Sequence, residues 1–392
     1  MENKLEVLAV LLTNRCNLKC IYCGRNENKD NSCAKQELTA DEWINIFEDA
    51  KTVGLKKVNM TGGEIFCRKD VLEIIERTIN LGLDVSIETN GTVVTEEQIK
   101  YLSRFKDHLS ISISLDGIRK ETNDLTRGKG SYERAFKTIN IIKKYNIPLR
   151  IITVLSKNNY DEIPELATTI HEKLGLGFRL LPNIIEYGKG VEASETEAVD
   201  YNRIQKLMDD FYYEFLRKHS DAKNLSIELN TAIIPVDIYQ HSLCPWGKGM
   251  LGIGYSGKVA LCHVGSDNDL FIFDNAKDNP ISKIWKENKK LKQYKELNPD
   301  KLKGICGNCL ARNLCRGGCR LHALMKYDGD FYAPDPECQN VYNLGKFPKY
   351  AMENEDKDCS YKGWLWRFQH LFIFLMIKFG MHYIKNIYMY QK

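Results

Sequence analysis

The first 181 residues alternate between strand-like and helix-like segments, and this alternation constrains the fold more than any other feature of the chain. Six runs rich in Val, Ile and Leu are typical of strands, at residues 5–13, 57–61, 83–89, 108–115, 148–155 and 177–181. Helical patterns separate them, near residues 39–53, 69–81, 95–105, 131–145 and 160–174. Strands that alternate with helices pack as a parallel sheet with right-handed crossovers. We therefore expect an α/β fold.

Distinct motifs follow the first four of these strands. They are the cysteine loop TNRCNLKCIYC at 13–23, TGGE at 61–64, TNGT at 89–92 and SLDG at 114–117. In parallel barrels, the residues at the carboxyl ends of the strands meet at one end of the barrel and carry the chemistry. The sequence therefore predicts that the four motifs contribute to one site.

The cysteine loop has the composition of a metal site with an open position. Cys16, Cys20 and Cys23 are separated by three and then two residues. A four-iron cluster normally takes four thiolates, so three cysteines on one short loop leave one iron for a ligand that is not protein. The alternatives are a zinc site that lacks one ligand and three structural thiols.

The chain has thirteen cysteines, an odd number. Seven of them are clustered late in the chain, as Cys244, Cys262, Cys306, Cys309, Cys315, Cys319 and Cys338. The others outside the loop are Cys33, Cys67 and Cys359. We expect no signal peptide at the start of the chain. This expectation and the odd number of cysteines argue against a disulfide framework. Reduced thiolates that hold metal are the better interpretation, and two zinc ribbons are the competing one.

The loop pattern C-x3-C-x-Tyr-C resembles that of radical S-adenosylmethionine (SAM) enzymes. The late cysteines, with their x2, x5 and x3 spacings and with Gly257 five residues before Cys262, resemble the SPASM extension of that family. The resemblance covers about residues 5–345. It implies a partial (β/α)6 barrel in residues 1–225, a SPASM domain in 226–345 and a C-terminal helical tail in 346–392.

The resemblance also implies the cofactors. A [4Fe–4S] cluster on Cys16, Cys20 and Cys23 would bind SAM and, after reduction by flavodoxin or ferredoxin, cleave it to a 5′-deoxyadenosyl radical that abstracts hydrogen from a carbon. The cofactor carries this chemistry, while the protein binds, orients and excludes water.

Five of the implied SAM contacts lie in the motifs after the second and fourth strands. The carbonyls of Gly62 and Gly63, together with Glu64, would receive the ammonium group of SAM, and glycine lets the backbone approach a ligand closely. Ser114 and Asp116 would contact the ribose hydroxyls. The alternatives are a simple glycine turn and a Ser/Asp pair that caps a loop.

Four further contacts are implied outside these motifs. Arg127 would pair with the SAM carboxylate through its planar fork, and Tyr22 would pack beside the adenine. Asn158 and Leu181 follow the fifth and end the sixth strand, where relatives touch the nucleoside. The alternatives are a solvated surface arginine and a core tyrosine.

Family connectivity divides the late cysteines between two auxiliary [4Fe–4S] clusters. Cluster I would be held by Cys244, Cys262 and Cys319, and cluster II by Cys306, Cys309, Cys315 and Cys338. Ile238 stands where sulfatase-maturing enzymes have a further cysteine, so cluster I would have an open iron. Substrate, a small thiol or a distant ligand would complete it, and Cys33, Cys67 and Cys359 are the candidates for that ligand.

Two residues are candidates for direct catalysis. Cys67 follows Glu64 by three residues, and a thiol there would return a hydrogen atom to a substrate radical, as peptide epimerases require. His263 directly follows Cys262 and would act as a base. A small core cysteine and a structural histidine are the alternatives.

The substrate is less constrained by sequence. The net charge of +4, with no basic arm, excludes nucleic acid as the expected partner. SPASM enzymes mostly mature peptides or proteins, so we expect such a substrate, with a small molecule or tetrapyrrole as the alternative. Fifteen residues before Cys16 leave no room for a leader-binding domain, so we expect a separate leader-binding protein or direct recognition. An electron-transfer protein would not explain the TGGE and SLDG motifs.

The tail from 362 to 392 is aromatic and basic, with no acidic residue. Its apolar run is too short for a membrane span, which needs about 20 residues. Such a segment can lie at a membrane interface. We therefore expect a cytoplasmic enzyme with peripheral membrane contact as an open alternative.

Overall fold

The computed structural model describes residues 4–24, 36–182, 184, 190–220, 222, 225–227 and 244–353. The chain forms two compact units, one from Met1–Asp200 with Pro245–Leu297 and one from Tyr201–Cys244 with Asn298–Lys392. These units do not coincide with the predicted domain boundaries at 225 and 345, which stay predictions. Most of the tail, Cys33, Cys359 and Ile238 lie outside the described residues.

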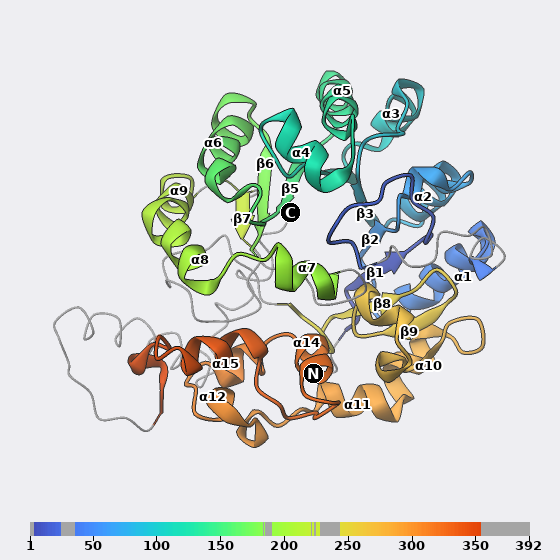
Figure 1. Cartoon of the computed structure of the whole chain (residues 1–392). Helices are drawn as coiled ribbons and strands as arrows, with labels where there is room; N and C mark the ends of the chain where they lie inside the picture. Colours follow the sequence, from blue (N-terminus) through green and yellow to red (C-terminus); the bar gives the residue numbers. More distant parts are fainter. Residues whose placement is uncertain are drawn as a thin grey trace. The chain divides into compact units, whose positions relative to one another are not determined.

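The first unit is built on one sheet (Figure 1). Its strands are β1 (Val7–Leu11), β2 (Lys57–Thr61), β3 (Asp84–Thr89), β4 (Leu109–Ser114), β5 (Leu149–Val154), β6 (Gly177–Leu181), β8 (Met250–Ile253), β9 (Lys258–Ala260) and β10 (Asp274–Asn275). They lie in the order β10-β9-β8-β1-β2-β3-β4-β5-β6. β1 to β6 are parallel, each to the next. The six predicted strands and the α/β fold with a partial barrel are confirmed.

One part of this sheet was not predicted. β8 pairs in parallel with the free edge of β1, with Val7 opposite Met250 and Val10 opposite Ile253. β9 and β10 then continue the sheet as antiparallel strands. The chain therefore returns to its first strand about 240 residues later, and the second edge of β1 is covered.

Helices cover the outer face of the parallel strands in this unit (Figure 1). They are α1 (Ala40–Lys51), α2 (Val71–Asn80), α3 (Glu96–Leu102), α5 (Ser131–Lys144) and α6 (Ile163–Thr168). The unit also contains α4 (Lys120–Arg127), α7 (Gly190–Thr196), α10 (Ile281–Glu287) and α11 (Lys289–Lys295). Thr39 and Thr95 begin α1 and α3 with capping boxes, which satisfy amides that have no partner inside the helix.

The core of the first unit lies between the strands and these outer helices. On β2, Val58 and Met60 are fully buried, whereas the alternate residues 57, 59 and 61 are only partly buried. Trp43 and Phe47 of α1 are also fully buried, and their rings stack with centroids 5.7 Å apart. Because successive strand residues point to opposite faces, this alternation places apolar side chains outward and polar ones on the inner face.

The second unit is built from short elements. They are α8 (Tyr201–Leu207), α9 (Tyr213–Lys218), β7 (Leu225–Ile227), α12 (Gly304–Gly307), α13 (Arg312–Cys315), α14 (Arg320–Lys326) and α15 (Pro336–Asn343). α15 packs against both α12 and α14. In the part of the chain that the structure describes, no helix has the length and apolar character needed to cross a membrane.

Candidate functional site

The cysteine loop is packed directly against the TGGE motif. The amide of Gly63 donates to the carbonyl of Thr13 at 2.8 Å, and the amide of Glu64 donates to that of Arg15 at 2.7 Å. A Cβ atom on Gly62 would stand 2.8 Å from the Thr13 oxygen, and one on Gly63 would stand 2.4 Å from the Arg15 oxygen. Both glycines are therefore required for contact between two backbone segments, a reason the sequence analysis did not give them.

Glu64 connects the TGGE motif to the end of β3. Its carboxylate accepts hydrogen bonds from the Thr89 hydroxyl and the Asn90 amide, both at 2.7 Å, and from the Phe66 amide at 3.2 Å. The side chain is buried, and burial raises its pKa although these donors lower it. Three of about four acceptor positions are thus used inside the protein, which leaves one for a ligand.

Asn90 and Asn17 join the same strand end to the cysteine loop. The Asn90 side-chain amide donates to the Asn17 side-chain oxygen at 3.0 Å and lies 3.9 Å from the sulfur of Cys16. Asn17 donates to the Thr92 hydroxyl at 2.8 Å. The sequence analysis singled out the TNGT motif but not this role for Asn90, and it missed Asn17.

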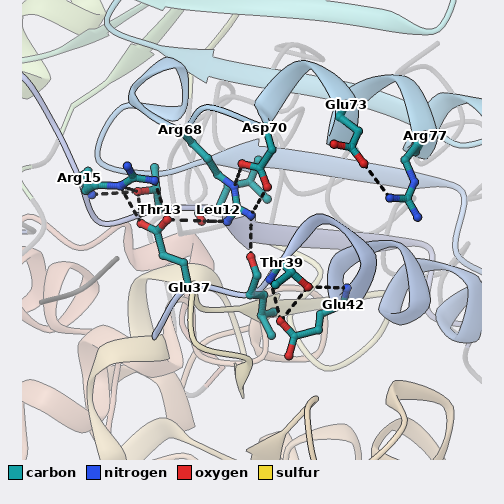
Figure 2. A network of polar contacts seen from close by, with 11 residues as sticks. Leu12, Thr13, Arg15, Glu37, Thr39, Glu42, Arg68, Asp70, Glu73 and Arg77 are labelled. Atoms are coloured by element: carbon teal, nitrogen blue, oxygen red, sulfur yellow. Dashed lines mark hydrogen bonds and ion pairs between the residues drawn. The ribbon is translucent and has the colours of Figure 1, made fainter. Parts of the chain in front are cut away.

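A partly buried network of ion pairs, drawn in Figure 2, holds the base of the cysteine loop. Arg15, the residue before Cys16, pairs with Glu37 at 2.7 Å. Arg68 is 4% exposed and donates to the carbonyls of Leu12 at 2.9 Å and Leu38 at 2.6 Å. Arg68 also pairs with Asp70 at 2.7 Å. The network therefore ties the end of β1 to the segment before α1, and the sequence analysis did not predict it.

The three loop thiols lie in a partly buried environment. Burial raises the pKa of Cys16 to about 12, and the nearby groups Glu64, Cys20 and Cys23 raise it further, against an amide of Leu18 that lies 3.4 Å from its sulfur. Burial also raises the pKa of Cys20. Thiols in such a place need a positively charged metal centre to become thiolates.

Cys67 lies beside this loop. Burial raises the pKa of its thiol and Glu64 adds to this, while the backbone amide of Asn17 acts in the opposite direction. The thiol is partly exposed. The structure thus brings the predicted hydrogen-atom donor next to a residue of the cysteine loop.

Tyr22, Asp116 and Arg127 form a buried cluster at the end of β4. Arg127 contacts Asp116 twice, at 2.6 Å through Nε and at 3.1 Å through Nη2, and the Tyr22 hydroxyl donates to the same carboxylate. Asp116 is fully buried and also accepts from the Val154 amide at 3.0 Å. The pKa of Arg127 is raised because Asp116 and Tyr22 outweigh the opposing effect of burial. A solvated Arg127 is therefore excluded.

The remaining predicted SAM contacts lie at the carboxyl ends of β4, β5 and β6. Ser114 ends β4 and is partly exposed, and its hydroxyl forms no hydrogen bond with the described residues. Asn158 donates to Glu197 at 2.6 Å. Leu181 ends β6 and accepts a backbone hydrogen bond from Leu155 at 2.9 Å. Ser114 has its whole hydroxyl available, and Asn158 still has a second N–H and its carbonyl oxygen.

Cys262 and His263 follow β9 and pack on β8 within the first unit. A Cβ atom on Gly252 would stand 2.0 Å from the carbonyl carbon of Cys262 and 2.2 Å from the nitrogen of His263. Ser266 donates to the His263 carbonyl at 2.7 Å. Only glycine therefore fits at position 252, because a side chain there would overlap the backbone of Cys262 and His263. Cys244 and Cys319 belong to the second unit, where Cys244 is exposed.

The four cysteines assigned to cluster II belong to the second unit, and Asp335 contacts two of them, Cys306 and Cys338. Cys306, Cys309 and Cys338 are buried. The Asp335 amide donates to the sulfur of Cys306 at 3.3 Å, and its carboxylate accepts from the amides of Cys319 and Cys338, both at 3.1 Å. Burial raises the pKa of Cys306 to about 12. The sequence analysis did not identify Asp335, although it stands three residues before Cys338.

The surroundings of the loop cysteines and of the four cysteines assigned to cluster II suit iron–sulfur clusters. Both groups consist of cysteines that are partly or fully buried, and backbone or side-chain amides approach their sulfurs. Amide donors to sulfur are one of the means by which proteins hold and tune such clusters. Within the described residues, no group of three or more His, Cys, Asp or Glu side chains is arranged to hold a single metal ion.

Comparisons with known proteins agree with this arrangement. The sequence profile of the Radical SAM superfamily matches residues 10–170, and that of the SPASM iron–sulfur cluster-binding domain matches residues 244–310. The AdoMet-dependent heme synthase of Methanosarcina barkeri is 28% identical, over 88% of this chain and 99% of its own length. The PqqA peptide cyclase of Rhizobium meliloti is 29% identical, over 83% of this chain and 85% of its own length.

Among solved structures, Streptococcus suis SuiB bound to its precursor peptide SuiA has a similar fold. The TM-score is 0.67 at 20% sequence identity, and the match covers 86% of this chain and 76% of SuiB. At this identity the likeness concerns the fold alone.

Proposed function

We propose that this chain, which belongs to the radical SAM superfamily and carries a SPASM domain, matures a peptide or protein substrate by hydrogen abstraction from carbon. The observation that carries the proposal is the similarity to peptide-modifying relatives, here the PqqA peptide cyclase, across most of both chains. The match to the fold of a SPASM protein with a bound precursor peptide agrees with it.

The two domains imply a SAM-binding [4Fe–4S] cluster and auxiliary iron–sulfur clusters. When bound, these groups and SAM supply the electron and the 5′-deoxyadenosyl radical. The residues that would hold the first cluster are Cys16, Cys20 and Cys23. The chain's own contribution is to fix their loop through Gly63, Glu64 and the Arg68 network, since a misplaced loop would misplace the radical.

Around SAM, we propose roles that follow the hydrogen-bonding capacity left in the structure. Ser114 offers a hydroxyl with no partner among the described residues, which suits a ribose contact. Glu64 retains one acceptor position for the ammonium group. Asp116 holds Arg127 and Tyr22 in place, so that its effect on SAM passes through these two side chains.

A tetrapyrrole oxidoreductase is the second candidate function. It is favoured by the heme synthase of M. barkeri, which this chain matches over 99% of that protein's length. Both candidates share the radical SAM and SPASM domains, so the domains alone do not separate them.

The test is anaerobic incubation with SAM and reductant in deuterated water, with either peptides encoded beside the gene or a panel of iron tetrapyrroles. A peptide that loses two hydrogens indicates a crosslink or oxidation, and one that gains one deuterium indicates epimerisation. Conversion of a tetrapyrrole with no change in any peptide would overturn the proposal in favour of the second candidate.

The same assay examines the proposed partners. Flavodoxin or ferredoxin should replace the chemical reductant if either is the electron donor. If a peptide is converted only when a second protein is present, that protein supplies leader binding.

Cys67→Ala should abolish deuterium gain but not SAM cleavage if its thiol returns the hydrogen atom. His263→Gln should abolish the change in the peptide but not SAM cleavage if His263 is the base.

The sequence of the tail supports a second, independent proposal of peripheral membrane contact. Residues 362–392 carry aromatic and basic side chains and no acid, a composition that suits an anionic interface. Deleting these residues should abolish flotation with anionic liposomes and leave SAM cleavage unchanged. Equal flotation of the two forms would overturn this proposal.

A further inference from the structure

Arg320 is a buried cation with unused hydrogen-bonding capacity. It is 1% exposed, which is unusual for an arginine. Its Nη1 donates to the Ala333 carbonyl at 2.7 Å, and its Nη2 donates to the Gly317 carbonyl. Its Nε–H is also buried and has no acceptor within the part of the chain that the structure describes.

Among the described residues, no carboxylate forms an ion pair with Arg320, and Asp335 and Asp330 act on it only from a longer distance. The nearby acid is Asp335, whose oxygens are directed to the backbone amides of Cys319, Glu337 and Cys338. A buried charge without a counterion costs several kcal/mol. A group with negative charge beside the buried Nε–H would therefore satisfy Arg320.

A second arginine beside the same cysteines provides the contrast. Arg312 donates to the carbonyl of Cys309 at 3.2 Å. Its guanidinium forms ion pairs with Asp300 at 3.1 Å and with Glu353 at 3.0 Å. Arg312 is thus already neutralised by carboxylates, whereas Arg320 is not.

The groups around Arg320 are cysteines. It follows Cys319 directly, and its acceptor Gly317 lies between Cys315 and Cys319. Its other acceptor, Ala333, stands two residues before Asp335, whose amide donates to the sulfur of Cys306 at 3.3 Å. Cys306 and Cys315 belong to the four-cysteine set of proposed cluster II. Thiolates with a cluster between them would supply the negative charge that the surroundings of Arg320 lack.

We propose that Arg320 is the fixed countercharge of the auxiliary cluster held by Cys306, Cys309, Cys315 and Cys338, and that its Nε–H donates to a sulfur of that site. The reduced form of a cluster carries one more negative charge than the oxidised form. A permanent cation beside it therefore favours the reduced form and raises its reduction potential. Arg320 is in this sense a positioning and tuning residue and not a catalytic one.

The proposal rests on the assignment of these four cysteines to one cluster, and that assignment is tested separately. Full-length Cys306→Ala/Cys309→Ala should lose about four irons per chain after anaerobic reconstitution. If this variant retains all its iron, the cluster assignment fails. If it loses them, the assignment holds and the role of Arg320 is decided by the next experiment.

That experiment is an EPR-monitored redox titration of full-length protein in a Cys16→Ala/Cys20→Ala/Cys23→Ala background, which lacks the SAM-binding cluster. The cluster II signal is the one absent from the Cys306→Ala/Cys309→Ala variant. Arg320→Gln should shift its potential to more negative values than in the background protein. Arg312→Gln should shift it much less, since Asp300 and Glu353 already neutralise that guanidinium.

A loss of the cluster in Arg320→Gln is also informative. Arg320→Lys keeps the charge but not the planar fork. If Arg320→Gln loses cluster II iron and Arg320→Lys retains it, the countercharge role is supported. If both variants lose it equally, or if Arg320→Gln keeps its iron and an unchanged potential, the proposal is overturned and Arg320 serves only to bind Gly317 and Ala333.

Discussion

The two cysteine-rich regions of the chain are built differently. In the loop of Cys16, Cys20 and Cys23 all three thiols are partly exposed, and neighbouring strand ends hold the loop from outside. In the second unit, Cys306 and Cys309 are only 4% and 5% exposed; Cys306 lies on the short helix α12, and Cys309 follows it and bridges to Met352. The first region keeps a surface open for a ligand that must enter and leave.

The second region is enclosed, and this suits a cluster that exchanges only electrons. There Asp335 contacts the cysteines themselves, since its amide donates to the sulfur of Cys306 and its carboxylate accepts from the amides of Cys319 and Cys338. In the first region the polar groups fix the backbone instead, through Glu64 and Arg68. The loop cysteines are thus more exposed than those of the second unit, as SAM binding requires, and the buried cysteines suit a cluster that only transfers electrons.

SAM cleavage should separate the two regions most sharply. Cys20→Ala should abolish 5′-deoxyadenosine formation and remove about four irons of about twelve. Cys306→Ala/Cys309→Ala should remove about four irons as well, yet still cleave SAM, since SAM binds at the other cluster. Iron analysis and chromatography of the nucleoside measure both results. Loss of SAM cleavage in a folded Cys306→Ala/Cys309→Ala protein would contradict the idea that only the first region is needed for SAM cleavage.

Asp335 should be the largest stability determinant of the enclosed region. Asp335→Ala leaves three backbone amides without an acceptor, at about 1–3 kcal/mol each, or on the order of 6 kcal/mol in total. Asp335→Asn keeps one acceptor oxygen and should lie between wild type and Asp335→Ala. Urea unfolding measures the free energy. Lys303→Gln breaks the exposed ion pair with Asp330 and is the control, with a much smaller expected effect.

Asp116 should be the corresponding determinant of stability near the cysteine loop. Asp116→Asn leaves Arg127 buried without its counterion, which costs about 3–5 kcal/mol. The double variant Asp116→Asn/Arg127→Met should recover part of this loss, because no buried charge remains. Glu133→Gln breaks the exposed pair with Lys120 and should change stability far less. Equal unfolding free energies for Asp116→Asn and Glu133→Gln would contradict the buried pair.

Gly63 should show the smallest of these effects on stability and a larger one on SAM binding. Gly63→Ala places a Cβ atom 2.4 Å from the Arg15 oxygen, so the cysteine loop must shift, at about 1–3 kcal/mol. Gly249→Ala is the matched control, since its Cβ would meet no atom closer than 3.8 Å. Thermal unfolding and SAM affinity measure the two consequences. A Gly63→Ala protein with wild-type SAM affinity would show that the loop tolerates displacement.

The fold was largely predictable from sequence because the apolar runs of β1 to β6 are strong and regularly spaced. β8 was missed, since four residues far along the chain carry no local sign that they pair with β1. α4 was missed for another reason. Its sequence KETNDLTR has no apolar stripe, and only its ends and polar contacts define it.

The candidate site was predictable in location but not in its internal bonds. The motifs at the strand ends do meet, because parallel strands bring their carboxyl ends together. That Glu64 binds Thr89 and Asn90, or that Asp116 binds Arg127, depends on side chains brought together by tertiary packing. That Arg320 is buried could not be predicted either, because an arginine beside a cysteine is ordinarily exposed.

The pairing of β8 with β1 has a consequence for synthesis on the ribosome. β1 leads into the cysteine loop, and one of its edges stays unpaired until Met250–Ile253 emerges, about 240 residues after β1. At about 5–20 residues per second this takes roughly 10–50 s. During that interval the nascent chain presents an open strand edge, which invites pairing with other chains. Cells that express this protein therefore have to shield this strand edge until the late strand has arrived.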